Sequence, residues 1–286
     1  MDRFRSLALE FWLFGLKQAR ASIFGAVLLA LILITRFAYP AEAPLGRYDF
    51  LFLAALAIQA VLIAAKLETM EEAVVIFVFH ICGTVMELFK TKVGSWSYPE
   101  ASILHLGAVP LFSGFMYSAV GSYLAQASRL FDLRFSAYPR MRWTLVLAAL
   151  IYENFFTHHF IPDLRLGLFA LAALLFWRVQ VHFTIGSISR AMPLLLGFFL
   201  VALFIWLAEN VGTFSRIWVY PAQADGFAMV PIGKLGAWYL LMLVSFVLVS
   251  LVHRPVLIDM PSGLQQASGT LDRTADDLGR RQPAMG

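Results

Sequence analysis

Two glutamates precede the same aromatic motif at the same distance, and both could do acid–base chemistry. The matching residues are Glu87, Trp96, Tyr98 and Pro99 and, 122 positions later, Glu209, Trp218, Tyr220 and Pro221. Carboxyl groups act as general acids and bases, so the pair could protonate an isoprenoid double bond or carry a proton in transport. The alternative is that each glutamate pairs with Lys90, Lys92 or Arg216 and merely ends its helix.

The aromatic side chains of this motif are candidate substrate-binding residues. They are Trp96, Tyr98, Trp218 and Tyr220. Tryptophan and tyrosine also gather at membrane borders without any further function. Because Pro99 and Pro221 fix the backbone φ angle beside each tyrosine, they favour a turn of defined shape.

A third group of polar side chains lies between 152 and 165 and could line a cavity that binds substrate. Its members are Glu153, Asn154, His158, His159 and Asp163. A histidine–carboxylate metal site is conceivable here. With six histidines in the whole chain, however, we expect no metal and no cofactor.

The elements that must position these residues follow from the composition. Of 286 residues, 60% are hydrophobic and 14% are charged, and the mean hydropathy is +0.75. A soluble domain has about 45–50% apolar and about 25% charged residues. This excess excludes a soluble enzyme, and it excludes a nucleic-acid binder despite the pI of about 9.3. Cys82 is the only cysteine, so a disulfide scaffold is excluded too.

The apolar residues predict an all-α bundle of about eight transmembrane helices. Blocks of about 20 residues span the hydrocarbon core of a bilayer as helices. The predicted spans are 22–38, 50–66, 72–89, 103–126, 143–160, 166–183, 192–210 and 231–252. Residues 1–21 predict an amphipathic helix lying at the membrane interface. Residues 255–286 are polar and predict a disordered tail.

The basic residues predict that both termini are cytoplasmic in the inner (plasma) membrane. With eight spans, fifteen of the 22 lysines and arginines lie on the side of the termini. Cytoplasmic loops carry such an excess.

The spacing of 122 residues also predicts an internal repeat. Val109-Pro110 and Val230-Pro231 each follow the aromatic motif by about ten residues and open an apolar span. We therefore expect two four-helix halves, 22–132 and 133–254, in the same orientation about an axis along the membrane normal. Such an axis would bring Glu87 and Glu209 towards one shared cavity near the outer face.

Several stretches resemble a known family. GSWSYPE, VPLFSGFMYSAVGSY, RLFDLRF and YENFFTHHFIPDLR are similar to the YoaT-like family of bacterial integral membrane proteins, a domain of unknown function, over roughly residues 20–255. This resemblance implies a membrane location and no established activity. The repeats also resemble, more weakly, those of membrane carotenoid cyclases and hydratases. The acidic pair that such cyclases carry after the last proline is replaced here by Phe112-Ser113 and Gly233-Lys234.

Three functions remain open on the sequence. The first is an enzyme that modifies a lipid or isoprenoid and uses Glu87 and Glu209 as acid and base. The second is a small-molecule transporter, and the third is a membrane assembly protein without chemistry. The expected partners are membrane lipid and a lipid or isoprenoid substrate, with no nucleic acid, and the oligomeric state is left open.

Overall fold

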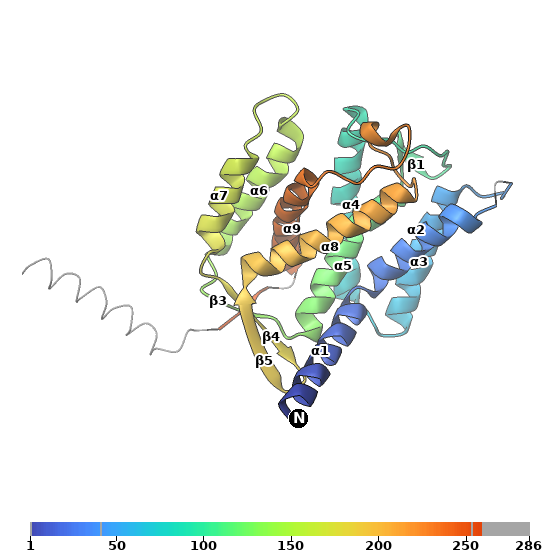
Figure 1. The fold of residues 1–286 in the computed structure, drawn as a ribbon. Coiled ribbons are helices and arrows are strands. Elements are labelled where there is room, and N and C mark those ends of the chain that lie inside the picture. Colours follow the sequence, from blue (N-terminus) through green and yellow to red (C-terminus); the bar gives the residue numbers. More distant parts are fainter. Residues whose placement is uncertain (1, 41, 253, 259–286) are drawn as a thin grey trace, which may run out of the picture.

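The protein is a helical bundle with a small β-sheet at one end (Figure 1). A computed structural model describes residues 2–40, 42–252 and 254–258. The helices are α1 (Asp2–Ala21), α2 (Ile23–Ala38), α3 (Arg47–Ala64), α4 (Met70–Lys92), α5 (Ser113–Leu130), α6 (Met141–Thr157), α7 (Arg165–Phe176), α8 (Leu194–Phe214) and α9 (Gly233–Val252), with a 3₁₀ turn at Pro221–Gln223.

Four of these helices, α3, α4, α8 and α9, are long and apolar enough to cross a membrane. A fifth crossing results if α1 and α2, which meet at an angle of 70°, form one broken span. Large apolar side chains also cover the outside of the bundle, as at Phe77 and Phe204, which are 62% and 70% exposed. Such a surface is stable in lipid and not in water. The chain is a multi-pass membrane protein.

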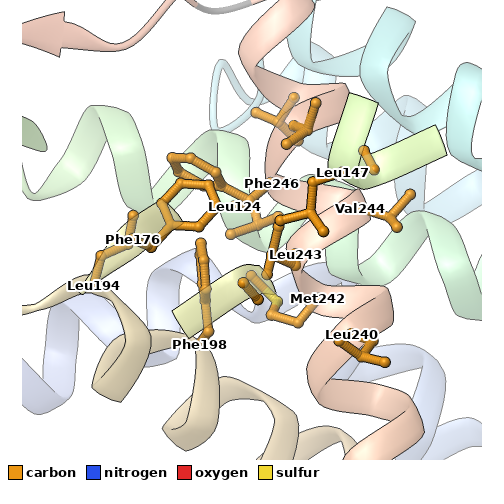
Figure 2. Packing of buried hydrophobic residues seen from close by; sticks show 14 of the residues in the cluster. Leu124, Leu147, Phe176, Leu194, Phe198, Leu240, Met242, Leu243, Val244 and Phe246 are labelled. Atoms are coloured by element: carbon orange, nitrogen blue, oxygen red, sulfur yellow. The ribbon is translucent and has the colours of Figure 1, made fainter. Parts of the chain in front are cut away.

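The largest apolar core surrounds α9, which packs against α8, α6 and α5 (Figure 2). Phe198 of α8, Phe176 of α7 and Leu147 of α6 converge there on Phe246 and Leu243 of α9. A second core joins α2, α3 and α5. Because α5 packs against α9, α4 and α2, it connects the two cores.

The expectation of an all-α bundle holds for most of the chain, but some segments form strands. The strands are β1 (His105–Leu106), β2 (Val109–Pro110), β3 (Arg134–Ser136), β4 (Gln180–Ile185), β5 (Ile188–Pro193) and β6 (Val256–Leu257). β1 and β2 form a hairpin, and the other four form a sheet in the order β5-β4-β3-β6. All contacts in this sheet are antiparallel except β3 with β6.

Two predicted spans are shorter as helices than the hydropathy suggested. The span 166–183 contains α7, which ends at Phe176, and then enters β4. From 178 to 185 apolar and polar residues alternate, which is the period of a half-buried strand. Val179, Val181 and Ile185 are accordingly buried, and Gly186 turns the hairpin with a φ of +60°. The span 103–126 opens with the β1–β2 hairpin, so α5 begins only at Ser113.

The structure describes nearly all of the predicted N-terminal helix but only the first part of the predicted C-terminal tail. α1 covers residues 2–21, the predicted interfacial helix. Most of the predicted tail, 259–286, lies outside the described residues. Its first part is not disordered, because β6 pairs with β3.

The loops of the bundle separate into two ends (Figure 1). The connections α2–α3, α4–α5, α6–α7 and α8–α9 lie at one end, and the N-terminal part of α1 and strands β3–β5 lie at the other. Both Trp-x-Tyr-Pro loops therefore meet at the same end of the bundle. There Ser97 and Val219 form an antiparallel bridge in which each backbone N–H donates to the other's carbonyl, at 3.0 and 2.9 Å.

Candidate functional site

The Glu87 carboxylate is buried in the last turns of α4 and accepts three hydrogen bonds from aromatic side chains. Trp96 Nε1 and Tyr98 OH donate to its Oε2 at 2.7 and 2.6 Å, and Tyr117 OH of α5 donates to its Oε1 at 2.8 Å. Glu87 as a residue is 2% exposed. The aromatic motif therefore serves to satisfy a buried acid, which would otherwise be costly.

The Glu209 carboxylate has a similar environment at the end of α8. Tyr220 OH donates to its Oε1, and Trp238 Nε1 of α9 donates to its Oε2 at 2.7 Å. Lys234, in the first turn of α9, lies close enough to interact with its charge. Within the described residues neither glutamate forms an ion pair with Lys90, Lys92 or Arg216, so the helix-end pairing considered above is absent.

Aromatic contacts join the two glutamates into one site. The Trp96 ring meets the Tyr220 ring edge to face at 5.9 Å, and the Tyr117 ring lies 6.3 Å from the Trp238 ring. Each contact therefore connects a donor of Glu87 with a donor of Glu209. Both carboxylates also act electrostatically on the hydroxyls of Tyr117 and Tyr220.

The tyrosine hydroxyls in the two loops remain protonated donors. Burial raises the pKa of Tyr98 and of Tyr220 well above the usual value, and the adjacent glutamates raise it further. A phenol that keeps its proton can donate a hydrogen bond to a carboxylate at any physiological pH.

An apolar pocket extends from this site into the bundle. It is a narrow cleft between α4, α5, α6, α8 and α9, partly open to the outside, with a cavity volume of about 30 Å³. Tyr117 and Trp238 form part of its lining together with Phe79, Met86 and Leu241. Two of the five residues that donate to the glutamates, Tyr117 and Trp238, therefore also form a wall of the pocket.

The backbone of the second loop is tied down by side chains from α8. Asn210 Oδ1 accepts from Val230 N at 2.9 Å, and Trp206 Nε1 donates to Val230 O at 3.2 Å. In the described structure Trp218 does not donate to Glu209 in the way that Trp96 donates to Glu87. Its ring instead lies so close to Gly212 that a side chain there would collide with it.

The polar group around 153–163 meets α4 at Lys90. Lys90 Nζ lies 2.8 Å from His159 Nε2 and 3.5 Å from His158 Nε2, and it stands 4.0 Å above the Phe155 ring. Lys90 is 3% exposed and follows Glu87 by one turn of α4. The two histidines therefore lie beside the glutamate site.

The remaining residues of this group stabilise the α6–α7 connection. Asn154 donates to Asp163 at 3.1 Å and accepts from the backbone N–H of Leu164. Desolvation acts to raise the pKa of Asp163, but hydrogen bonds from Asn154 and Arg165 and the charge of Arg165 hold it below its usual value. Glu153 is exposed and forms no ion pair in the described part of the chain.

The sequence interpretation missed four residues of this site: Tyr117, Trp238, Lys90 and Lys234. Tyr117 lies among the small residues Ser113, Gly114, Ser118, Gly121 and Ser122, whose spacing indicates close helix packing. Two features of the sequence could have identified the others. Lys234 and Trp238 lie just beyond the second Val-Pro element, and Lys90 lies one helical turn after Glu87. Among the described residues, no three His, Cys, Asp or Glu side chains come together in a way that could hold a metal ion.

Comparison with known proteins places this architecture in a family. The model of the family described as "Protein of unknown function (DUF817)" matches residues 10–246. The chain belongs to the DUF817 family. A DUF817 relative, "Uncharacterized protein YoaT" of Bacillus subtilis (strain 168), is 42% identical over 237 residues, which are 83% of this chain and 89% of that protein.

The solved structures that resemble this DUF817 chain are distant. One is the crystal structure of MvINS, a mycobacterial Insig homolog from Mycobacterium vanbaalenii, with 14% identity, a TM-score of 0.47, and coverage of 66% of this chain and 97% of that one. A cross-linked trimer of MvINS matches with 16% identity, a TM-score of 0.46 and the same coverage.

Proposed function

We propose that this protein is an inner-membrane enzyme that modifies a lipid or isoprenoid by proton transfer through Glu87 and Glu209. One observation carries the proposal. Two buried carboxylates, distant in sequence, are joined by Trp96–Tyr220 and Tyr117–Trp238 contacts, and the second contact walls an apolar pocket. Paired acids and an apolar chain site are what the chemistry of an unsaturated hydrocarbon requires.

Tyr117 is the proposed connection between acid and substrate. Its ring lines the pocket while its hydroxyl bonds Glu87 Oε1, so it separates the carboxylate from the bound chain. A proton that leaves the hydroxyl towards a double bond is replaced from Glu87 in its acid form. A second proton, lost from an adjacent carbon, is taken up by the Glu209 carboxylate, and proton exchange with water then restores the acid form of Glu87 and the carboxylate form of Glu209. The substrate would then rearrange without a change of composition or oxidation state.

The two-repeat architecture is part of this proposal. Shifting by 122 residues moves α4 onto α8 and α5 onto α9, and the packed pairs α4–α5 and α2–α5 correspond to α8–α9 and α6–α9. Ser97 and Val219, which pair with each other, are themselves 122 residues apart. A pair of equivalent residues that bond reciprocally supports a twofold axis between them. Because α5 packs against α9, we place the axis between these two helices and not between α4 and α8.

The test is to identify the bound amphiphile and follow its conversion. We expect an isoprenoid or acyl lipid to co-purify with the full chain and to be recovered by solvent extraction and mass spectrometry. Incubation with the wild type should give an isomer of equal mass. Glu87→Gln, Glu209→Gln and Tyr117→Phe should bind the lipid and lose at least 100-fold in rate, as loss of a general acid or base typically costs.

Glu42→Gln is the matched control, because it changes an exposed carboxylate of the same type in the α2–α3 connection. It should retain wild-type turnover. Binding without conversion by the wild type, or equal conversion by all variants, would contradict the catalytic proposal. Directional uptake of the amphiphile into sealed vesicles without conversion would support the transporter instead.

A further inference from the structure

We propose that Lys90, His158, His159 and Lys234 bind a phosphate or diphosphate group, the anionic head of an amphiphile whose chain occupies the apolar pocket. The identification of this amphiphile as the substrate rests on the proposed function. Phosphate binding itself can be measured without turnover.

Lys90 is the starting point, because its ammonium group is buried without an acid. In the described structure its closest polar neighbours are the two imidazoles, at 2.8 and 3.5 Å, and the Phe155 ring completes its surroundings. A buried cation is normally paired with an anion or a strong acceptor. A bound anion would supply the missing partner.

The charges around Lys90 add to its own. Lys234 and Arg165 both lie close enough to repel it, and Asp163 is the acid that acts on it. Asp163 is already paired with Arg165 at 3.1 Å and hydrogen-bonded to Asn154. Asp163 is therefore already engaged and does not bond to Lys90 in the described structure.

The start of α9 reinforces this field. Helix N-termini favour anions, and acidic side chains are usual in the first turn. α9 has none there and carries Lys234, whose Nζ stands 4.4 Å above the Tyr220 ring. The Trp96 and Tyr220 rings lie under this ammonium, and the Glu209 carboxylate is the acid that acts on it.

The histidines suit a multivalent oxygen anion. His158 Nδ1 lies 2.9 Å from the Asn154 carbonyl and donates to it, so its Nε2 faces the Lys90 side. When protonated, this Nε2 and that of His159 would donate to separate oxygens alongside Lys90. Phosphate offers several such oxygens. His159 is exposed, so the cluster is accessible from outside the bundle.

The position also fits an amphiphile. Lys90 lies about 4.5 Å along α4 from Glu87, and Met86 on the same helix lines the pocket. A phosphate at Lys90 would hold the following chain beside Tyr117 and Trp238.

The test is calorimetric titration of the full chain in uncharged maltoside micelles with inorganic pyrophosphate as the probe. We expect saturable binding by the wild type. Lys90→Met, which keeps the apolar stem, should raise the dissociation constant at least tenfold, since one charge-assisted hydrogen bond is lost. Lys92→Met, an exposed lysine of the same helical turn, should leave it unchanged.

A second arm identifies the source of the phosphate. Phosphatidic acid added to the micelles should compete with pyrophosphate, because a lipid head group would occupy the same site. Absence of competition would overturn the amphiphile as ligand and leave a soluble phosphate compound. Should Lys90→Met fail to give a monodisperse protein, Lys234→Met replaces it with the same expectation. Absence of saturable binding, or equal affinity in the wild type and the folded variant, overturns the proposal. Phosphate binding by the turnover-deficient Glu87→Gln would separate this result from a failure of the catalytic proposal.

Discussion

At the scale of single residues, the donors to both glutamates are aromatic and uncharged. Trp96, Tyr98 and Tyr117 supply three directed hydrogen bonds to Glu87, and Tyr220 and Trp238 supply two to Glu209. Such donors hold a carboxyl group in place without fixing a formal cation beside it. The carboxyl group can then change its protonation state without breaking an ion pair.

Replacing Trp96 by Phe should destabilise the protein by about 1–3 kcal/mol. The change removes one donor from a buried carboxylate and leaves most of the ring contact with Tyr220. Reversible unfolding in mixed micelles, followed by near-ultraviolet circular dichroism, measures the difference. Trp143→Phe, at a position 51% exposed, is the control and should cost less than about 0.5 kcal/mol. Equal effects of the two changes would mean that the bond to Glu87 contributes nothing measurable.

Glu87→Gln and Glu209→Gln should be non-additive. Because aromatic donors connect the two carboxylates, removal of one charge alters the environment of the other, and we expect a coupling energy above about 0.5 kcal/mol. A double-mutant cycle of unfolding free energies measures it. The control cycle combines Glu87→Gln with Glu68→Gln, just before the opposite end of α4, which should be additive within about 0.3–0.5 kcal/mol. An additive Glu87–Glu209 cycle would refute a shared site.

At the scale of elements, the α4–α5 contact positions the site. Three glycines allow close approach there, since side chains from the other helix occupy the space of each missing Cβ: Gly83 meets Tyr117, Gly114 meets His80, and Gly121 meets Phe79. Small residues permit such close helix packing in membranes. The small residues of α5 thus form the surface that presents Tyr117 to Glu87.

Gly83→Ala should displace Tyr117 and weaken the site. The added Cβ would lie 2.5 Å from Tyr117 Cδ2 and 2.8 Å from its Cβ, so the ring cannot simply rotate away. Overpacking of this kind costs about 1–3 kcal/mol. Melting temperature and the intrinsic fluorescence of Trp238, which contacts Tyr117, are the readouts.

Gly167→Ala is the matched control for that change, because nothing lies within 4 Å of the added Cβ. It should be neutral or stabilising, since alanine favours a helix over glycine. A Gly83→Ala protein with wild-type stability and fluorescence would show that α4 and α5 can separate freely.

At the scale of the whole molecule, we expect both termini in the cytoplasm and the Trp-x-Tyr-Pro loops outside. Fifteen of the 22 basic residues lie on the side assigned to the cytoplasm. A fluorescent protein fused after Gly286 should fluoresce, and alkaline phosphatase inserted at Asp225 should be active, since each folds on one side of the membrane. Active phosphatase at the C-terminus would imply an odd number of crossings and would contradict the parallel repeat.

The sequence by itself determined the membrane character, most helix positions and the residues around which the site forms. Six predicted spans agree in position with α2, α3, α4, α6, α8 and α9 within a few residues, and four of these helices, α3, α4, α8 and α9, are long and apolar enough to cross a membrane. Glu87 and Glu209 could be recognised because their spacing to tryptophan, tyrosine and proline recurs. These are local signals, so they survive without knowledge of contacts.

Tertiary structure alone decided which side chains meet. Tyr117 and Trp238 bind the glutamates from other helices, and Lys90 meets histidines 68 and 69 residues away. The strands β4 and β5 also depend on partners, since they pair with each other, β3 pairs with β4, and β6 pairs with β3. Hydropathy counts how apolar a segment is and carries no record of its neighbours. The chemistry of this site depends on those neighbours, because a buried carboxylate is defined by the donors that surround it.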